Sequence, residues 1–212
     1  TLALNPSEDL LALSSVAVNP SPLEQGKTAV IRVQAPAGSA LSGSLFSYPL
    51  HFFPDAQGSF TALQGVPRLQ SPGLAQFVLT LSAADGRSFA VQQNLLVKQM
   101  DYGFDSPLQV SDATTEPEVT GPEFDQIMSV VAEAPPDKMW YSAFQPPIPD
   151  HERITSYYGR LRSYNGSTYD YFHSGLDYAG NDTTPVLAVA PGIVVFVGRD
   201  LTVRGNATII SH

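Results

Sequence analysis

His173 and Asp177 are the residues of this chain whose types and spacing best suit metal chemistry. They stand four positions apart, on either side of Gly175. Histidine nitrogen and aspartate oxygen bind zinc at roughly 2.0–2.2 Å, so both side chains must converge on one point. Residues four apart on an extended strand are about 13 Å from each other, which is too far to share an ion. A helix would bring them together, but Gly175 and the aromatic flanks disfavour one.

The remaining solution is a bend at Ser174-Gly175, with His173 ending one strand and Asp177 beginning the next. Two interpretations of such a pair are open. It is either two ligands of a zinc site or a buried histidine hydrogen-bonded to a nearby aspartate in an ordinary loop. The spacing alone does not choose between them.

Motifs on both sides of the pair give it a context. The segment before it contains Ser156-Tyr157-Tyr158-Gly159-Arg160-Leu161-Arg162, and the segment after it begins Thr184-Pro185-Val186 and continues to Gly198. Over about residues 140–212 the chain resembles the lysostaphin-like (LytM-type) zinc metalloendopeptidases. That family carries S-x-F-G-x-R, H-x-x-x-D and T-P-V-x-A-x-x-x-G-x-V on successive strands. The opening motif departs slightly here, with Tyr158 in place of phenylalanine and arginines at both Arg160 and Arg162.

The resemblance implies a function for the full-length protein. Members of this family cut peptide bonds in bacterial peptidoglycan with a bound zinc ion. We therefore expect a zinc-dependent endopeptidase that acts on peptidoglycan peptides outside the cytoplasm, whether secreted, periplasmic or attached to the cell envelope. His173 and Asp177 match two metal ligands of the family. Tyr164 matches a tyrosine that precedes the ligand histidine, which makes it a candidate contact to the substrate or the transition state.

The family's third ligand and its general-base histidine come from later motifs. Neither motif occurs before the chain ends at His212, so the resemblance predicts a catalytic domain that is truncated and a fragment that is inactive by itself. His212 matches a histidine that ends a strand upstream of those motifs, and it is not predicted as a ligand. His151 lies in an acidic loop and is not predicted as one either.

Neighbouring residues are assigned supporting roles. We expect Arg160 and Arg162 to fix their loop by hydrogen bonds, and Asp170 is a candidate acceptor for a ring nitrogen of His173. The alternative function is that of a non-catalytic LytM-type domain that binds the wall or activates amidases. Such domains typically lose the ligands, so the intact pair favours the enzyme. A purely structural or adhesive surface protein would leave the pair unexplained.

The composition restricts the remaining classes. The chain of 212 residues has no cysteine, which excludes a disulfide framework or a thiolate metal site. Its net charge is −9 without a basic run, which argues against nucleic acid as a partner. No apolar stretch is long enough to span a bilayer. The start at Thr1 shows neither an initiator methionine nor a leader, so the chain is interpreted as a mature or trimmed form.

The fold class predicted is mainly β. Only 15% of residues are charged and 18 are proline, which favours sheets joined by turns. Residues 1–104 are predicted to form an immunoglobulin-like β-sandwich, because short alternating runs are separated by turn signals such as Asp85-Gly86. His51 in this region is interpreted as a packed core residue. The segment Leu2–Leu13 fits either a short helix or an unpaired tail.

Residues 105–149 are predicted to be a linker with a short helix, and residues 150–212 the first part of an antiparallel peptidase domain. The linker is acidic and extended up to Pro122, which would occupy the first turn of a helix over 122–132. Its apolar face is expected to pack against one of the β-domains, and it consists of Phe124, Ile127, Met128 and Val131. In the last region two Val-rich runs, 186–190 and 193–197, are predicted to be consecutive buried strands.

Overall fold

The computed structural model describes residues 15–55, 58–148 and 153–212. The segment Leu2–Leu13 and His151 lie outside these ranges. The chain divides into two compact units, Thr1–Asp101 and Tyr102–His212. As predicted, the described residues are mainly β, with antiparallel sheets and a single α-helix.

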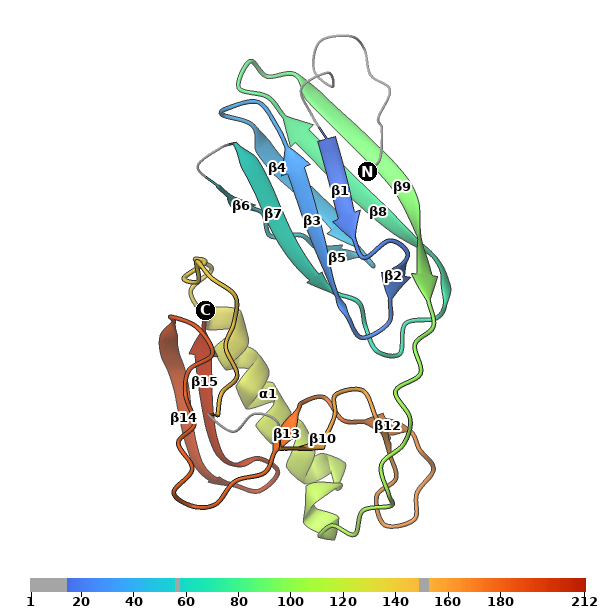
Figure 1. The fold of residues 1–212 in the computed structure, drawn as a ribbon, viewed down its shortest axis with the longest axis vertical. Helices are drawn as coiled ribbons and strands as arrows, with labels where there is room; N and C mark the ends of the chain where they lie inside the picture. The colour runs from blue at the N-terminus through green and yellow to red at the C-terminus, as the bar shows by residue number, and fades with distance from the viewer. Residues whose placement is uncertain (1–14, 56–57, 149–152) are drawn as a thin grey trace. The chain divides into compact units, whose positions relative to one another are not determined.

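Two sheets make up the first unit (Figure 1). The first has the order β1-β3-β7-β6, with bounds Ser15–Asn19, Thr28–Gln34, Ser59–Gly65 and Phe53–Pro54. The second has the order β2-β9-β8-β4-β5, with bounds Leu23–Glu24, Ser88–Lys98, Gly73–Ser82, Ala40–Leu45 and Tyr48–Pro49. All strand pairs are antiparallel except β2 with β9.

The core of the first unit follows from side chains that alternate along each strand. In β3 the buried residues are Ala29, Ile31 and Val33, and in β8 they include Phe77 and Leu79. Successive residues of a strand point to opposite faces, so each sheet directs one apolar face at the other. Sixteen buried apolar residues, all within the first unit, form this cluster.

Two local predictions for the first unit have different outcomes. The Asp85-Gly86 turn is confirmed, because it joins β8 to β9 and Gly86 adopts a left-handed φ of 88°. The interpretation of His51 as a core residue is wrong, because its side chain is exposed. Its neighbours Leu50 and Phe52 pack on the core instead, and alternation along the extended chain turns His51 outward.

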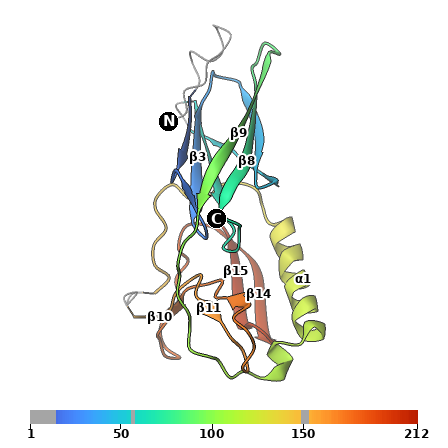
Figure 2. The ribbon, with the colours of Figure 1, turned by 90° about the vertical axis from the view of Figure 1, so that its right-hand side faces the viewer.

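The second unit contains three antiparallel strand pairs (Figure 2). These are β10 (Ile154–Ser156) with β13 (Asp177–Tyr178), β11 (Leu161–Arg162) with β12 (Tyr171–Phe172), and β14 (Ile193–Leu201) with β15 (Gly205–Ser211). The chain that enters this unit runs beside β11, where Phe104 and Leu108 form parallel bridges to Leu161 and Tyr164. A 3₁₀ turn, η1 (Asp112–Thr114), and the helix α1 (Pro117–Glu133) follow.

Helix α1 begins at Pro117 and not at Pro122 as predicted. Pro117 occupies the first turn, where the missing N–H costs nothing, and Pro122 lies inside the helix. The segment from residue 111, predicted to be extended, is therefore largely helical.

Within the second unit most of the apolar helix face does not pack as predicted, and of its four residues Ile127 alone is half-buried. Phe124, Met128 and Val131 are 53%, 46% and 50% exposed. The side of α1 that faces the protein instead includes the buried Glu123, which binds the turn between β14 and β15. The contact between α1 and the strands is therefore made by a hydrogen-bonded carboxylate, where the sequence pattern predicted apolar side chains.

The segment 186–190 is not the buried strand that the sequence predicts. Val186 is 79% exposed and Leu187 is 53% exposed. Its backbone makes two hydrogen bonds to an earlier segment of the chain. Leu187 N–H donates to Pro147 O (2.7 Å), and Val189 O accepts from Gln145 N–H (2.8 Å). Pro147 has no N–H with which to donate in return, and neither segment forms a strand.

The second Val-rich run does form a strand, β14, but Ile193, Val194 and Val197 on it are at least half exposed. Burial of this strand is therefore not confirmed. Its turn to β15 lies at residues 202–204. Within the described residues, no helix has the length and apolar character needed to cross a membrane.

Candidate metal centre

The backbone brings His173 and Asp177 together as the spacing predicts. His173 directly follows β12, the chain bends at Gly175, and Asp177 begins β13. The backbone of His173 is fixed on both sides, since its N–H donates to Arg160 O and its carbonyl accepts from Gly159 N–H, both at 2.8 Å. Asp177 is fixed by pairing with Ser156 of β10.

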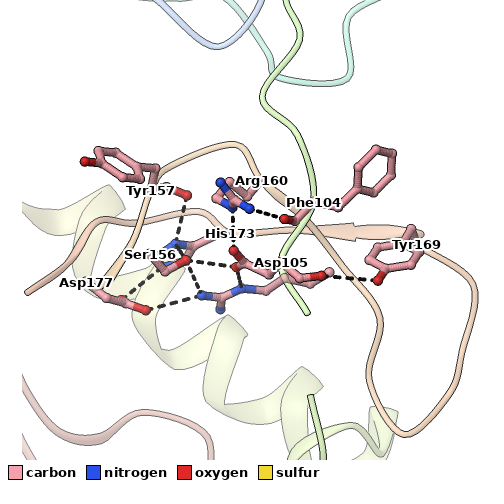
Figure 3. Close-up of polar contacts among 9 residues, drawn as sticks. Phe104, Asp105, Ser156, Tyr157, Arg160, Tyr169, His173 and Asp177 are labelled. Carbon is pink, nitrogen blue, oxygen red and sulfur yellow. Dashed lines mark hydrogen bonds and ion pairs between the residues drawn. The ribbon is translucent and has the colours of Figure 1, made fainter. Parts of the chain in front are cut away.

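The two side chains face each other across a short gap. His173 Nε2 lies 3.0 Å from Asp177 Oδ1 (Figure 3). The imidazole is nearly buried, with 8% of its side chain exposed, whereas the carboxylate is 51% exposed. The pair is therefore accessible from the Asp177 side.

The other ring nitrogen of His173 is held by two oxygens. Nδ1 lies 3.1 Å from the Tyr157 carbonyl and 3.0 Å from Ser156 Oγ. A carbonyl can only accept, so this contact favours the tautomer with hydrogen on Nδ1. In that tautomer the Nε2 lone pair points at the Asp177 carboxylate, an arrangement that a cation between the two atoms would stabilise.

The donor set fits zinc. Two ligands at about 2.1 Å in a tetrahedral arrangement lie about 3.4 Å from each other, so the pair would open by only about 0.4 Å. A histidine whose second nitrogen donates to a carbonyl is a common arrangement in zinc proteins. Hydrogen on Nε2 would instead make a hydrogen bond to Asp177, which is the other interpretation that the sequence left open.

Ser156 links the histidine to a charged cluster. Its hydroxyl donates to Asp105 Oδ2 (2.9 Å) and accepts from Arg162 Nη2 (3.1 Å). Asp105 also accepts from Arg160 Nε (2.6 Å) and Arg162 Nε (3.1 Å). Burial by itself would raise the pKa of Asp105, but the hydrogen bonds from Ser156, Arg162 and Arg160 outweigh it, and the pKa lies below its ordinary value.

Arg162 connects this cluster to Asp177. Its Nη2 lies 3.2 Å from Asp177 Oδ2, so the two carboxylate oxygens of Asp177 have different neighbours, His173 and Arg162. The prediction that Arg162 fixes its loop by hydrogen bonds is thus incomplete, because it also contacts a candidate ligand. Burial lowers the pKa of Arg162, while Tyr164 and Asp105 raise it by more, and it stays fully charged.

Asp170 does not orient His173. Its carboxylate accepts a hydrogen bond from the Thr168 hydroxyl and is exposed, and the ring nitrogens of His173 have the neighbours described above. The orienting acceptors are the Tyr157 carbonyl and Ser156. Ser156 opens the S-x-F-G-x-R-like motif, so its position was visible in the sequence. Asp105 stands in no motif and could not be found there.

Tyr164 lies beside the pair without touching it in the described contacts. Its ring meets that of Tyr171 edge-on at 5.3 Å, and both line a cavity of about 740 Å³. A second cavity of about 530 Å³ is lined by Asp177 and Ser156. The two cavities share Leu108 and Arg162 as wall residues, so they adjoin.

His212 is placed elsewhere in the second unit. Its Nδ1 lies 3.1 Å from Pro191 O, and its ring is 5.5 Å from that of Phe144, which also contacts Trp140. It lines a separate cavity with Ile210. In the ranges that the structure describes, no three histidine, cysteine, aspartate or glutamate side chains converge as a metal site would require.

The fold has counterparts among solved structures. A crystal structure of a candidate M23 peptidase from Pseudomonas aeruginosa superposes with a TM-score of 0.59, covering 91% of this chain and 69% of that one at 18% sequence identity. M23 is the peptidase family to which LytM-type enzymes belong. At this identity the likeness shows a shared fold. No protein-family model matches the chain, and no curated protein does.

Proposed function

We propose that the full-length protein containing this chain is a zinc-dependent endopeptidase that hydrolyses peptide bonds of bacterial peptidoglycan outside the cytoplasm. The observation that supports it most directly is the 3.0 Å approach of His173 Nε2 to Asp177 Oδ1, with Nδ1 already bound to other oxygens. The likeness to the candidate M23 peptidase adds a fold suited to this chemistry.

In this proposal zinc supplies a Lewis acid and a bound water whose pKa is lowered to about 7. His173 would bind through Nε2 and Asp177 through Oδ1. Arg162 would hold the other oxygen of Asp177 and so favour ligation through one oxygen. The adjoining cavities would receive the peptide, with Tyr164 at the wall of the larger one as a substrate contact.

The test compares zinc binding and wall hydrolysis in matched variants of the full-length protein. We expect His173→Ala and Asp177→Asn each to weaken zinc binding by at least tenfold in competition with a chromogenic chelator. His51→Ala is the control, because this exposed histidine lies in the first unit. Zinc binding that is unchanged in both site variants would overturn the proposed metal centre.

Hydrolysis is measured as soluble peptide released from purified sacculi. Release that requires zinc and both site residues supports the peptidase. Binding of sacculi without release, in protein that holds zinc or lacks it, would instead support the alternative of a non-catalytic wall-binding or amidase-activating domain.

A further inference from the structure

One carboxylate receives hydrogen bonds from three side chains around the candidate centre. Ser156 Oγ, Arg160 Nε and Arg162 Nε all donate to Asp105, at 2.9, 2.6 and 3.1 Å (Figure 3). The Asp105 side chain is only 15% exposed. Charge-assisted hydrogen bonds in such a position are stronger and more directional than those at an open surface.

The backbone of Asp105 is fixed to the same elements. Its N–H donates to Leu161 O at 2.9 Å, and its carbonyl accepts from the Tyr169 hydroxyl at 3.2 Å. These contacts tie the entering chain to β11 and to the loop before β12. Asp105 therefore presents its carboxylate from a defined position.

Two of the three donors make the next contact to a candidate ligand. Ser156 lies 3.0 Å from His173 Nδ1, and Arg162 Nη2 lies 3.2 Å from Asp177 Oδ2. Each ligand is thus one side chain away from Asp105. We propose that Asp105 is the positioning residue of the centre, which sets the orientation of His173 through Ser156 and that of Asp177 through Arg162.

The mechanism of this positioning is the direction of one hydrogen bond. Ser156 has a single hydroxyl hydrogen, and Asp105 takes it. Toward His173, Ser156 can then only accept, so together with the Tyr157 carbonyl it favours hydrogen on Nδ1, which leaves the Nε2 lone pair free for a metal. Without the carboxylate, the hydroxyl can turn and donate to Nδ1 in competition with the Tyr157 carbonyl, and the Nε2–H tautomer, which cannot bind a metal through Nε2, then gains population.

The first experiment needs no metal. Imidazole ¹⁵N shifts of His173 are recorded at the same alkaline pH in wild type, Asp105→Asn and Asp170→Asn. We expect the Nε2–H tautomer to gain population in Asp105→Asn and to stay as in wild type in Asp170→Asn, where the same change is made at an exposed carboxylate. An unchanged tautomer in folded Asp105→Asn overturns the proposal.

A double-mutant cycle separates positioning from general damage. If Asp105 acts on His173 through Ser156, adding Asp105→Asn to Ser156→Ala produces no further change in tautomer population. A full additional change would overturn the proposed route. If Asp105→Asn does not fold, Ser156→Ala alone keeps the Asp105–arginine contacts and must by itself move the tautomer population, and no movement counts against the proposal.

Zinc affinity gives the second readout, and this part rests on the proposed function. We expect Asp105→Asn to weaken binding by about 10–100-fold and Asp105→Glu to recover part of the loss. If wild type does not bind zinc but the tautomer of His173 shifts in Asp105→Asn, the metal function is overturned and the positioning role stands. Zinc binding that is equal in wild type and Asp105→Asn overturns the positioning role alone.

Discussion

Asp105 connects the chemistry of this protein to pH. Its ionised form accepts hydrogen bonds from Ser156, Arg162 and Arg160, and these lower its pKa below the ordinary 3.8 despite the opposing effect of burial. A carboxyl whose pKa is lower in the folded state stabilises that state while it is ionised. The contribution is complete above the pKa of the unfolded chain and disappears as the pH falls through the lower folded value.

We therefore expect acid to destabilise the second unit through Asp105. Between pH 7 and about pH 3 the free energy of unfolding should fall in wild type and fall less in Asp105→Asn, which has no carboxyl to protonate. At pH 7 the variant should already be less stable by about 2 kcal/mol, because hydrogen bonds to a charged group are lost. Urea titrations at both pH values measure this, and parallel pH dependence in the two proteins would refute it.

At this scale the sequence reveals local geometry and misses distant partners. The arrangement of His173 and Asp177 could be predicted, because two residues four positions apart with a glycine between them meet most readily across a bend in the chain. The partners of this pair could not, since Asp105 meets Ser156, Arg160 and Arg162 from 51, 55 and 57 residues away. Those contacts depend on how the entering chain lies along β11, which no spacing encodes.

Helix α1 illustrates the element scale, because a charged residue fixes it. Glu123 accepts from Val203 N–H at 3.0 Å and from Arg204 Nη1 at 2.8 Å, at the turn between β14 and β15. The hydrogen bond from Val203, with those from Arg204, lowers the pKa of Glu123. The apolar periodicity of the sequence predicted that Phe124 and its neighbours would make the contact. It could not show that the Glu123 carboxylate has hydrogen-bond donors 80 residues later in the chain.

We expect Glu123→Gln to lower the melting temperature of the second unit at pH 7, and Phe124→Gln to leave it nearly unchanged. The first change weakens a charge-assisted contact that joins two elements, and the second alters a side chain that is already 53% exposed. Because the folded pKa of Glu123 is depressed, the difference should shrink as the pH falls below about 4.5. Thermal scans that rank the two variants in the opposite order would contradict this account of α1.

The turn before β11 offers a second element-scale prediction. Gly159 and Gly166 both have left-handed φ values, 84° and 80°, but only Gly159 faces a neighbour. A Cβ at Gly159 would lie 2.6 Å from the Tyr102 ring, whereas nothing lies within 4 Å at Gly166. We expect Gly166→Ala to cost about 1 kcal/mol in backbone strain and Gly159→Ala about 1–3 kcal/mol more. If urea denaturation shows equal losses of stability for the two variants, the Tyr102 ring moves aside without an energetic cost and the predicted difference is wrong.

Apolar burial is unevenly divided over the whole molecule. Among the described residues, the first unit encloses sixteen buried apolar side chains, whereas the second unit has one, Ile148. The second unit relies more on hydrogen bonds and ion pairs, such as those of Asp105 and Glu123. Composition predicted a mainly β chain correctly, but it could not show this division, since Val-rich runs such as 186–190 occur where the structure leaves them exposed.

Hydrogen exchange on the full chain should reveal the division. Amides of β3 and β8 are expected to be the most protected, because their strands are central in sheets that cover the core. Amides of β14 and β15 should exchange faster, since this pair has exposed apolar side chains and no further strand among the described residues. Equal protection of both sets would indicate that polar contacts stabilise the second unit as well as a core stabilises the first.

The same division has a consequence for sequence variation. The core of the first unit consists of many apolar side chains, none of which has a unique partner, so this core should tolerate substitutions that conserve volume. In the second unit a few polar atoms have specific hydrogen-bond partners, and no other side chain combines the shape and the hydrogen-bonding groups of Asp105, Ser156 or Arg162. A mutational scan should thus give two patterns. Most core positions of the first unit should accept several residues with a gradual loss of abundance, whereas a few polar positions of the second unit should accept almost none.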